Sequence, residues 1–190
     1  PYVETVEFVD IPGSSAINTI RLNGNGETMQ FNCTSANRIL MTFNGTKHFT
    51  VDSLNMKTLN ATYGWGVLYT NAAKYDSLIN CNIDLSMITG TSSANSNGIV
   101  ISASKTSPTS SGSGVTNIYI GNNIVNAGHP TSVGGAYYGM SLYGTSTAAG
   151  GLDSVYVINN EVKNFYYYGI YMYYSKNCKV LNNDVHKSTK

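Results

Sequence analysis

Charged residues are scarce in this sequence of 190 residues, and their scarcity narrows the range of partners that the protein can have. Lys, Arg, Asp and Glu together make up 11% of the chain and nearly balance, which leaves a formal net charge of +1 at pH 7. Domains that bind nucleic acid normally carry a basic face. We therefore expect no nucleic-acid partner.

Long hydrophobic runs and helical patterns are also missing. No run approaches the roughly 18 apolar residues that a membrane-spanning helix needs, so we expect no membrane insertion. No window places apolar residues at helical spacing, and β-branched residues, Tyr, Gly and Asn dominate in place of helix formers. Apolar and polar residues alternate over short stretches that end in Asn, Gly or Ser, which predicts short strands and an all-β fold.

Cysteine and histidine are too few to suggest a redox or metal centre. The three cysteines form an odd count, and two of them, Cys81 and Cys178, occupy strand positions typical of small buried residues. The three histidines are separated without the spacing of metal ligands. We expect no metal site and no cofactor.

An asparagine phrase between aliphatic residues recurs along the chain. Its clearest copies are "VINNEV" (157–162) and "VLNNDV" (180–185), which lie 23 residues apart, since 185 − 162 = 23. Three earlier and more divergent copies are "FTVDSLNM" (49–56), "SLINCNI" (77–83) and "IYIGNNIV" (118–125). A glycine followed by alternating apolar residues precedes the later copies, as "GVLY" (66–69), "GIVI" (98–101), "GMSL" (139–142) and "GIYM" (169–172). The stretch "RILM" (38–41) is this second phrase without its glycine.

This period indicates a solenoid, because self-similarity at roughly 20 to 50 residues is typical of repeat architectures. Three short strands in about 23 residues make one coil of a parallel β-helix, in which each coil hydrogen-bonds to the coils above and below it. The repeat predicts about five to six such coils.

Asparagine occupies one register of the repeat, and this register predicts a ladder. Its members are Asn80, Asn122, Asn159 and Asn182, with Ser53 at its start. Asn tolerates the left-handed backbone conformation that a sharp turn requires. Its amide can also donate to the next Asn of a stack and accept from the previous one. We expect an internal structural ladder of these four asparagines, which removes them from the candidates for chemistry.

The stretch "INNEV…YGIYM…NCKVLNNDV" resembles the right-handed parallel β-helix repeats of pectate-lyase-like proteins. The resemblance implies β-helix coils over residues 38–190, with residues 1–37 as a strand-rich first coil or capping segment of the same domain. The family includes polysaccharide lyases and hydrolases, bacterial surface adhesins, phage tailspikes and periplasmic accessory proteins, and fold alone does not choose among them. Because the last coil has no evident cap, we expect the sequence to be an excerpt of a longer protein.

Insertions in the repeat predict where a ligand would bind. The turn after the first strand of a coil is expanded at 102–114 and 143–152, and the turn after the third strand is expanded at 84–97 and 126–137. Both kinds of turn flank the first strand, so their loops would wall a groove on its outer face. The same groove holds the substrate in polysaccharide-active members of the family.

Alternation predicts the floor of this groove. The inward residues would be Ile39, Val67, Ile99, Met140 and Ile170. The outward residues, none of them charged, would be Leu40, Thr42, Leu68, Thr70, Val100, Ser102, Ser141, Tyr143, Tyr171 and Tyr173.

Tyrosines crowd one end of the expected groove. Their flat apolar faces and polar tips suit sugar rings or protein partners, and ring stacking between coils would use the same residues. The candidate ligand-binding residues are Tyr137, Tyr138, Tyr143, Tyr171 and Tyr173.

Carboxylates are spread singly along the chain, which weighs against catalysis. A lyase acting on acidic sugars needs carboxylates to hold calcium and a base to remove the proton, and a hydrolase needs two carboxylates at a defined separation. Asp84 lies in a loop of the expected groove, Asp153 closes another, and Lys105 could act with them. We assign no catalytic residue, and the catalytic set of an enzyme could lie in coils outside this sequence.

Abundant Ser, Thr and Asn suit a secreted protein. The tripeptides at 52–54, 76–78 and 153–155 resemble the Asp-Ser/Thr-aliphatic acceptor of an O-glycosylation system of some Gram-negative bacteria, with Ser53, Ser77 and Ser154 as acceptors. Asp-Ser also begins turns before strands, and both interpretations stay open. We expect an extracellular or cell-surface bacterial protein.

Two functions from different classes fit these observations. The first is a non-catalytic module of a secreted or cell-surface protein, an adhesin or stalk whose partners would be an extracellular glycan, another surface protein, or neighbouring coils or domains of a longer parent chain. The second is a polysaccharide lyase or glycoside hydrolase. A phage tailspike fragment is a further alternative, which obligate trimers would reveal.

Overall fold

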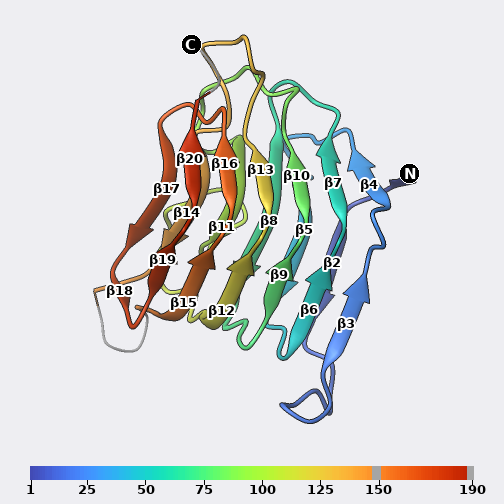
Figure 1. Cartoon of the computed structure of the whole chain (residues 1–190), viewed down its shortest axis with the longest axis vertical. Helices are drawn as coiled ribbons and strands as arrows, with labels where there is room; N and C mark the ends of the chain where they lie inside the picture. Colours follow the sequence, from blue (N-terminus) through green and yellow to red (C-terminus); the bar gives the residue numbers. More distant parts are fainter. Residues whose placement is uncertain (147–150, 188–190) are drawn as a thin grey trace.

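The computed structural model describes residues 1–146 and 151–187, which form 20 strands and no helix (Figure 1). These residues accordingly contain no helix able to cross a membrane. Every pairing between the strands is parallel. The all-β class that the sequence predicts is confirmed, with parallel strands arranged in three sheets.

The three sheets, which we call A, B and C, run side by side along the molecule. Sheet A consists of β1 (Tyr2–Val3), β4 (Thr28–Phe31), β7 (Asn55–Thr58), β10 (Asn82–Asp84), β13 (Ile124–Asn126), β16 (Glu161–Lys163) and β20 (Asp184–His186). Sheet B consists of β2 (Val6–Val9), β5 (Ile39–Asn44), β8 (Gly64–Thr70), β11 (Ser96–Ile101), β14 (Tyr138–Tyr143) and β17 (Tyr168–Tyr173). Sheet C consists of β3 (Ile20–Asn23), β6 (Phe49–Asp52), β9 (Ser77–Ile79), β12 (Thr116–Gly121), β15 (Leu152–Ile158), β18 (Ser175–Lys176) and β19 (Lys179–Leu181).

The chain visits sheets B, C and A in turn, and we call each such passage a circuit. Strands β2, β3 and β4 form circuit 1, which lies within residues 1–37, and β17 to β20 form circuit 6. The long connections follow β2, β10, β11, β13 and β14, and the last four are where the sequence predicts insertions. Residues 147–150 of the insertion predicted at 143–152 lie outside the described residues. Figure 1 shows the circuits side by side from β3 and β4 at one end to β17 and β20 at the other.

The core lies between the three sheets, and its register corrects one part of the predicted alternation. Val67, Ile99, Met140 and Ile170 are register partners that face the core, as expected, but their partner in circuit 2 is Met41. Ile39 was expected inside and instead pairs with Trp65, packing with it outside the main core. Leu40 was expected outside and belongs to the core.

Glycines at the start of the sheet B strands explain this error. A Cβ on Gly66 would lie 2.4 Å from Ile83 Cγ2 and 2.7 Å from the Gly98 carbonyl oxygen, so this position faces the interior. The next residue, Val67, also faces the interior, which means that simple alternation breaks at the glycine. In circuit 2, Leu40 occupies the position that Gly66 has in circuit 3. Aligning "RILM" with "GVLY" puts Arg38 at this position, two residues earlier.

The asparagine ladder exists, but its members are the residues that follow the predicted ones. Asn123 Nδ2 donates to Asn160 Oδ1 at 3.0 Å, and Asn160 Nδ2 donates to Asn183 Oδ1 at 2.9 Å. Cys81 takes the corresponding place in circuit 3, where its backbone N–H donates to Asn123 Oδ1 at 2.9 Å.

The predicted ladder residues instead shape the turns between sheets C and A. Asn80, Asn122, Asn159 and Asn182 have φ between 55° and 58°, and Ser53 shares this conformation at 55°. All four asparagines are exposed. Their tolerance of left-handed backbone is confirmed, whereas the prediction that they form the internal ladder is wrong, because the left-handed turn directs the following side chain inward.

Candidate functional site

The outer face of sheet B is covered in the middle of the molecule, so the expected open groove is wrong there. The loop between β11 and β12 lies across it. Ser141 Oγ on β14 donates to the Pro108 carbonyl at 2.9 Å, and Lys105 Nζ lies 2.7 Å from Glu7 Oε2 on β2. Seven of the expected floor residues are at most 4% exposed: Leu40, which belongs to the core, and Thr42, Leu68, Thr70, Val100, Ser102 and Ser141.

Apolar side chains and internal hydrogen bonds account for this coverage. Leu68 and Val100 pack with Trp65 outside the main core, and all three are fully buried. The loop before β11 contributes, since Trp65 Nε1 donates to the Ala94 carbonyl at 3.1 Å. Ser102 Oγ donates to the Ser107 carbonyl at 2.6 Å, so the second loop satisfies polar groups while it covers the strand. The two loops that flank β11 therefore cover the middle of the face and do not form the walls of a groove there.

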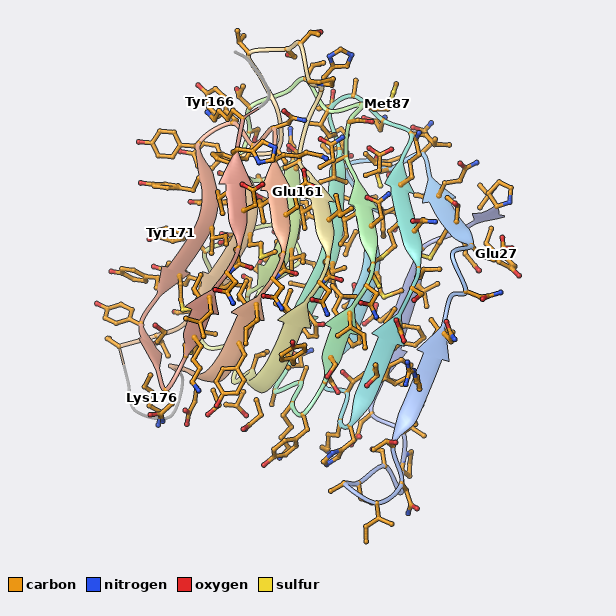
Figure 2. The ribbon with its side chains drawn as sticks, in the orientation of Figure 1. Glu27, Met87, Glu161, Tyr166, Tyr171 and Lys176 are labelled. Carbon is orange, nitrogen blue, oxygen red and sulfur yellow. The ribbon has the colours of Figure 1, made fainter. Side chains whose placement is uncertain are left out.

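Tyrosines make up most of this face on β14 and β17, with Ser141 between them. We define the tyrosine array as Tyr137, Tyr138, Tyr143, Tyr166, Tyr167, Tyr168, Tyr171, Tyr173 and Tyr174. Each ring centroid lies within 6.5 Å of another in the array. Figure 2 shows Tyr166 and Tyr171 at the end of the molecule that β17 forms.

All five tyrosines that the sequence nominates belong to the array, and their environments differ. Tyr173 is 36% exposed, whereas Tyr138 is only 8% exposed. Tyr168 was missed, although it stands one circuit after Tyr138 in the same register. That register was the available signal.

Rings of neighbouring circuits stack on one another, as the stacking interpretation predicts. The ring planes of Tyr138 and Tyr168 are 6° apart at a centroid distance of 5.8 Å. Tyr143 and Tyr173 stack at 4.8 Å and 22°. Such pairs contribute about 0.5–1.5 kcal/mol beyond the burial of area. The array is therefore a pre-ordered surface.

The phenol groups of Tyr138 and Tyr173 stay protonated at neutral pH. Burial raises the pKa of Tyr138 to about 12. A hydrogen bond with Tyr174 raises the pKa of Tyr173 to about 12. The hydroxyl groups can consequently both donate and accept hydrogen bonds.

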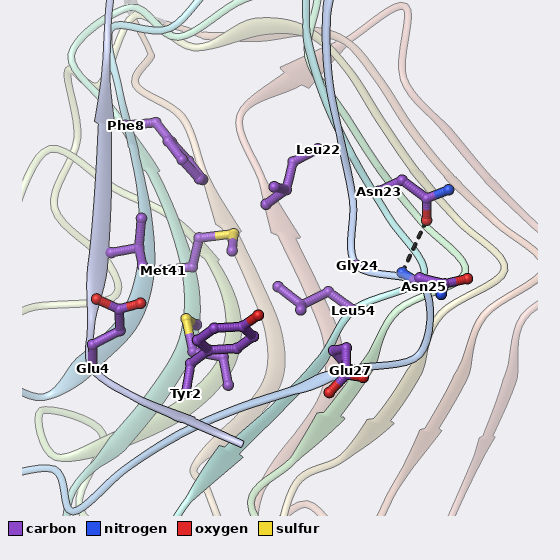
Figure 3. Close-up of a pocket in the computed structure, with 12 residues that line it drawn as sticks. Tyr2, Glu4, Phe8, Leu22, Asn23, Gly24, Asn25, Glu27, Met41 and Leu54 are labelled. Carbon is purple, nitrogen blue, oxygen red and sulfur yellow. Dashed lines mark hydrogen bonds between the residues drawn. The ribbon is translucent and has the colours of Figure 1, made fainter.

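A hollow lies at the end of the sheets opposite to the tyrosine array, inside circuit 1 (Figure 3). It has a volume of about 410 Å³, and Phe8, Leu22, Met41 and Leu54 are among the side chains that line it. The dashed line marks the hydrogen bond from the Asn25 N–H to Asn23 Oδ1, which is 3.0 Å long and lies at the turn beside the hollow. This hollow is the end of the apolar core rather than a set of convergent polar groups.

The acidic residues that the sequence considered for catalysis lie apart. Asp84 Oδ2 is 3.3 Å from Lys57 Nζ on sheet A, and Asp153 Oδ2 is 3.4 Å from Lys176 Nζ on sheet C. Lys105 pairs with Glu7 instead of either. Among residues 1–146 and 151–187, no three His, Cys, Asp or Glu side chains come together in a way that could hold a metal ion.

Glu7 is the polar residue of this face that sequence reasoning missed. It is the register partner of Thr42, and its pKa is lowered mainly by the hydrogen bond from Lys105. The alternation in "VEFV" was the available signal, because it places Glu7 on the opposite face from the core residues Val6 and Phe8.

The three candidate acceptor serines occupy two kinds of position. Ser53, directly after β6, and Ser154, within β15, have left-handed backbone with φ of 55° and 56°, and each hydroxyl donates to the preceding aspartate, at 2.8 and 3.1 Å. Ser77 lies within β9. Glycosylation of the three remains a prediction.

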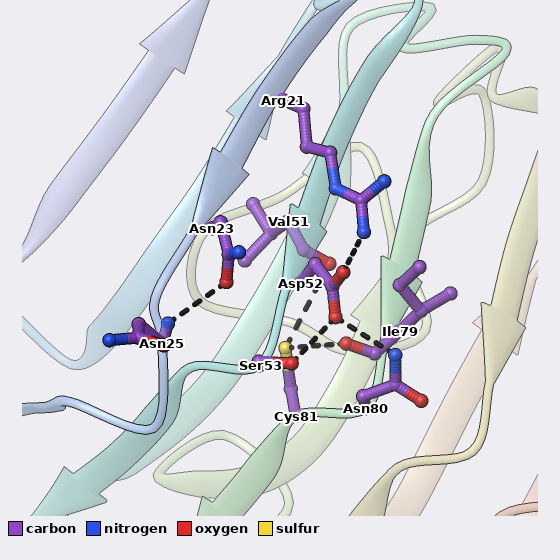
Figure 4. A network of polar contacts seen from close by, with 9 residues as sticks. All are labelled: Arg21, Asn23, Asn25, Val51, Asp52, Ser53, Ile79, Asn80 and Cys81. Carbon is purple, nitrogen blue, oxygen red and sulfur yellow. Dashed lines mark hydrogen bonds and ion pairs between the residues drawn. The ribbon is translucent and has the colours of Figure 1, made fainter.

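The aspartate beside Ser53 anchors a polar network (Figure 4). The amide of Asn80 donates to Asp52 Oδ1 at 2.8 Å, and the guanidinium of Arg21 pairs with the other carboxylate oxygen. The hydrogen bond from Asn80 is the main cause of the lowered pKa of Asp52. The network joins circuits 1, 2 and 3 through Arg21, Asp52 and Asn80. Its role is therefore to hold neighbouring circuits together.

Comparison with known proteins finds no family model, no curated protein and no solved structure that matches this chain.

Proposed function

We propose that the chain is a right-handed parallel β-helix and serves as a non-catalytic module of a bacterial secreted or cell-surface protein, an adhesin or stalk that binds carbohydrate through the tyrosine array. The β-helix part is supported by six successive circuits that each add parallel strands to the same three sheets. Repeats of this kind form long, stiff units with extended surfaces for binding.

The tyrosine array is the observation that carries the binding proposal. Tyr167, Tyr168, Tyr173 and Tyr174 are between 36% and 56% exposed, and each ring is already held by its neighbours. Binding then costs little side-chain entropy. A pyranose ring has a C–H face that can pack against a phenol ring and hydroxyl groups that can bond to the phenol tips.

The charge on the same face favours binding over hydrolysis. A hydrolase needs two carboxylates on either side of the scissile bond. In the described ranges, the carboxylate identified on the outer face of sheet B is that of Glu7, and it is paired with Lys105. A paired, single carboxylate supplies neither an acid and base couple nor a metal site.

A glycan array tests this proposal directly. The unmodified chain is expected to bind a subset of glycans, and the double variant Tyr171→Ala/Tyr173→Ala is expected to lose that binding. Tyr2→Ala is the matched control, because Tyr2 is 61% exposed and lies on β1, at the end of sheet A opposite to β20. Absence of binding by the unmodified chain, or equal binding by the double variant, contradicts the carbohydrate part of the proposal.

A further inference from the structure

A cavity of about 290 Å³ lies on the outer side of sheet C, away from the tyrosine array. Three tyrosines from different circuits line it: Tyr75 before β9, Tyr119 on β12 and Tyr156 on β15. Ser77, Asn117 and Ser154 contribute polar side chains to the same lining. Neither the repeat nor the proposed function accounts for this grouping.

The backbone brings these residues together in two parallel columns. Ser77, Tyr119 and Tyr156 are register partners on neighbouring strands of sheet C. Tyr75 before β9, Asn117 on β12 and Ser154 on β15 form the second column, two residues earlier along each strand, with left-handed φ of 59°, 55° and 56°. Left-handed backbone is costly for a tyrosine, so the turn geometry holds Tyr75 beside the cavity at some energetic cost.

Gly121 explains why a hollow opens beside Tyr119. A Cβ at position 121 would lie only 2.3 Å from Tyr119 Cε1, which means that the phenol ring leans over the glycine. Because the Tyr119 ring is turned toward Gly121, it leaves open the space between itself and Tyr75. The glycine therefore sets the position of the tyrosine that walls the cavity.

The polar groups of the cavity have hydrogen-bonding capacity to spare. Within the described part of the chain, Ser77 Oγ makes no hydrogen bond. Asn117 Nδ2 donates to Thr116 Oγ1 at 3.2 Å, which leaves the amide oxygen available as an acceptor. Ser154 Oγ donates to Asp153 and can still accept a hydrogen bond.

The cavity offers a ligand little exposed charge. Asp76 contributes to the lining but is only 1% exposed, and its oxygens accept from Thr46 Oγ1 at 2.5 Å and the Phe49 N–H at 2.9 Å. The ammonium groups of Lys74 and Lys179 lie over the rings of Tyr75 and Tyr156, at 5.9 and 5.4 Å from their centroids. Aromatic surface with neutral donors and acceptors is the chemistry that receives an uncharged polyhydroxylated ring.

We infer that this cavity is a binding site for one neutral sugar ring, with the C–H face of the sugar against Tyr119 and its hydroxyl groups bonded to Ser77, Asn117 and Ser154. The site is separate from the tyrosine array and does not depend on it. A chain with both sites would hold a glycan at two places, which raises avidity without any further contact.

Isothermal titration with short linear oligosaccharides of glucose, mannose or xylose tests the site. At least one of them is expected to bind, and Tyr119→Ala is expected to weaken that binding about tenfold or more. Gly121→Ala should weaken it as well, because the added methyl group pushes the Tyr119 ring toward the cavity. Tyr2→Ala, on β1 of sheet A, should leave this binding unchanged, because Tyr2 belongs to neither proposed site.

Two further arms separate a neutral ligand from other outcomes. The dissociation constant should change less than about twofold between 50 and 500 mM NaCl, because the side chains proposed to contact the sugar are all uncharged. Oligogalacturonate should bind no more tightly than the neutral sugars. Three results would overturn the inference. The first is that no neutral oligosaccharide binds, and the second is that one binds equally well to Tyr119→Ala, Ser77→Ala and the unmodified chain. The third is that oligogalacturonate binds more tightly than the neutral sugars, with an affinity that falls as salt is added. Ser77→Ala replaces Tyr119→Ala in this test if Tyr119→Ala does not fold. If Tyr173→Ala removes binding at the tyrosine array but binding at this cavity persists, the result supports two separate sites.

Discussion

Replacing Asn160 by alanine should strongly destabilise the fold, because this side chain joins three circuits at the centre of the ladder. Its Oδ1 accepts from the backbone N–H of Asn123 at 2.9 Å, and its Nδ2 donates to the Ile120 carbonyl at 3.0 Å and to Asn183 Oδ1 at 2.9 Å. The residue is 2% exposed, so water cannot easily replace the lost partners.

The magnitude follows from the groups that alanine leaves unpaired. Each buried donor or acceptor without a partner costs about 1–3 kcal/mol. Two such backbone groups, the Asn123 N–H and the Ile120 carbonyl, give a loss of about 2–6 kcal/mol in the free energy of unfolding. In a chain of this size, each kcal/mol lowers Tm by about 2–4 °C.

Urea unfolding followed by fluorescence measures this loss, since Trp65 is the single tryptophan and is fully buried. Asn159→Gly is the matched control: residue 159 is exposed with φ of 58°, which glycine adopts freely. Its free energy of unfolding should stay within about 1 kcal/mol of the unmodified chain. A large loss at residue 159 with little loss at residue 160 would refute the ladder as described.

Three further predictions concern the packing, a buried acid and the covering loop. Gly98→Ala should lower the free energy of unfolding by more than about 2 kcal/mol in urea, because its Cβ would lie 2.1 Å from the Gly139 carbonyl oxygen; an unchanged midpoint would contradict this packing. Burial raises the pKa of Asp76 from 3.8 to about 6, so the folded state binds the proton of Asp76 more tightly than the unfolded state does. This protonation stabilises the fold fully below pH 3.8, and the stabilisation is lost as the pH rises through about 6. Relative to the unmodified chain, Asp76→Asn should therefore gain about 2–3 kcal/mol between pH 4 and pH 7 in urea titrations, and a constant difference would disprove the shift. Lys105→Ala should change stability by less than about 1 kcal/mol, because its pair with Glu7 is solvent-exposed, and a larger effect in the same assay would show that the pair holds the loop.

The repeat could be predicted from the sequence because each circuit contributes aliphatic residues to one core. Val125, Val162 and Val185, which close the asparagine phrases, are register partners on sheet A. The doublets of asparagine hid which member lies inside, because both positions carry the same residue. The divergent copy "SLINCNI" distinguishes the two positions, because it has the exposed turn residue Asn80 followed by the buried Cys81.

The tyrosines of the candidate site could be predicted from the sequence, but the loop that covers the neighbouring strands could not. The tyrosines of β17 follow from alternation and register, which are local properties of the chain. The coverage of Leu68 by the loop between β11 and β12 depends on long-range packing, and the Ser-rich sequence of that loop does not specify which face it lies on. The hollow beside Tyr119 depends on one glycine two residues further along, which alternation does not mark.

Nuclear magnetic resonance of the chain with 13C-labelled tyrosine rings tests the central proposal most directly. During titration with a glycan that the chain binds, the ring signals of Tyr167, Tyr173 and Tyr174 should shift with increasing ligand, while the signal of Tyr2 stays in place. Unchanged signals from the array at saturating glycan would contradict its role in binding carbohydrate.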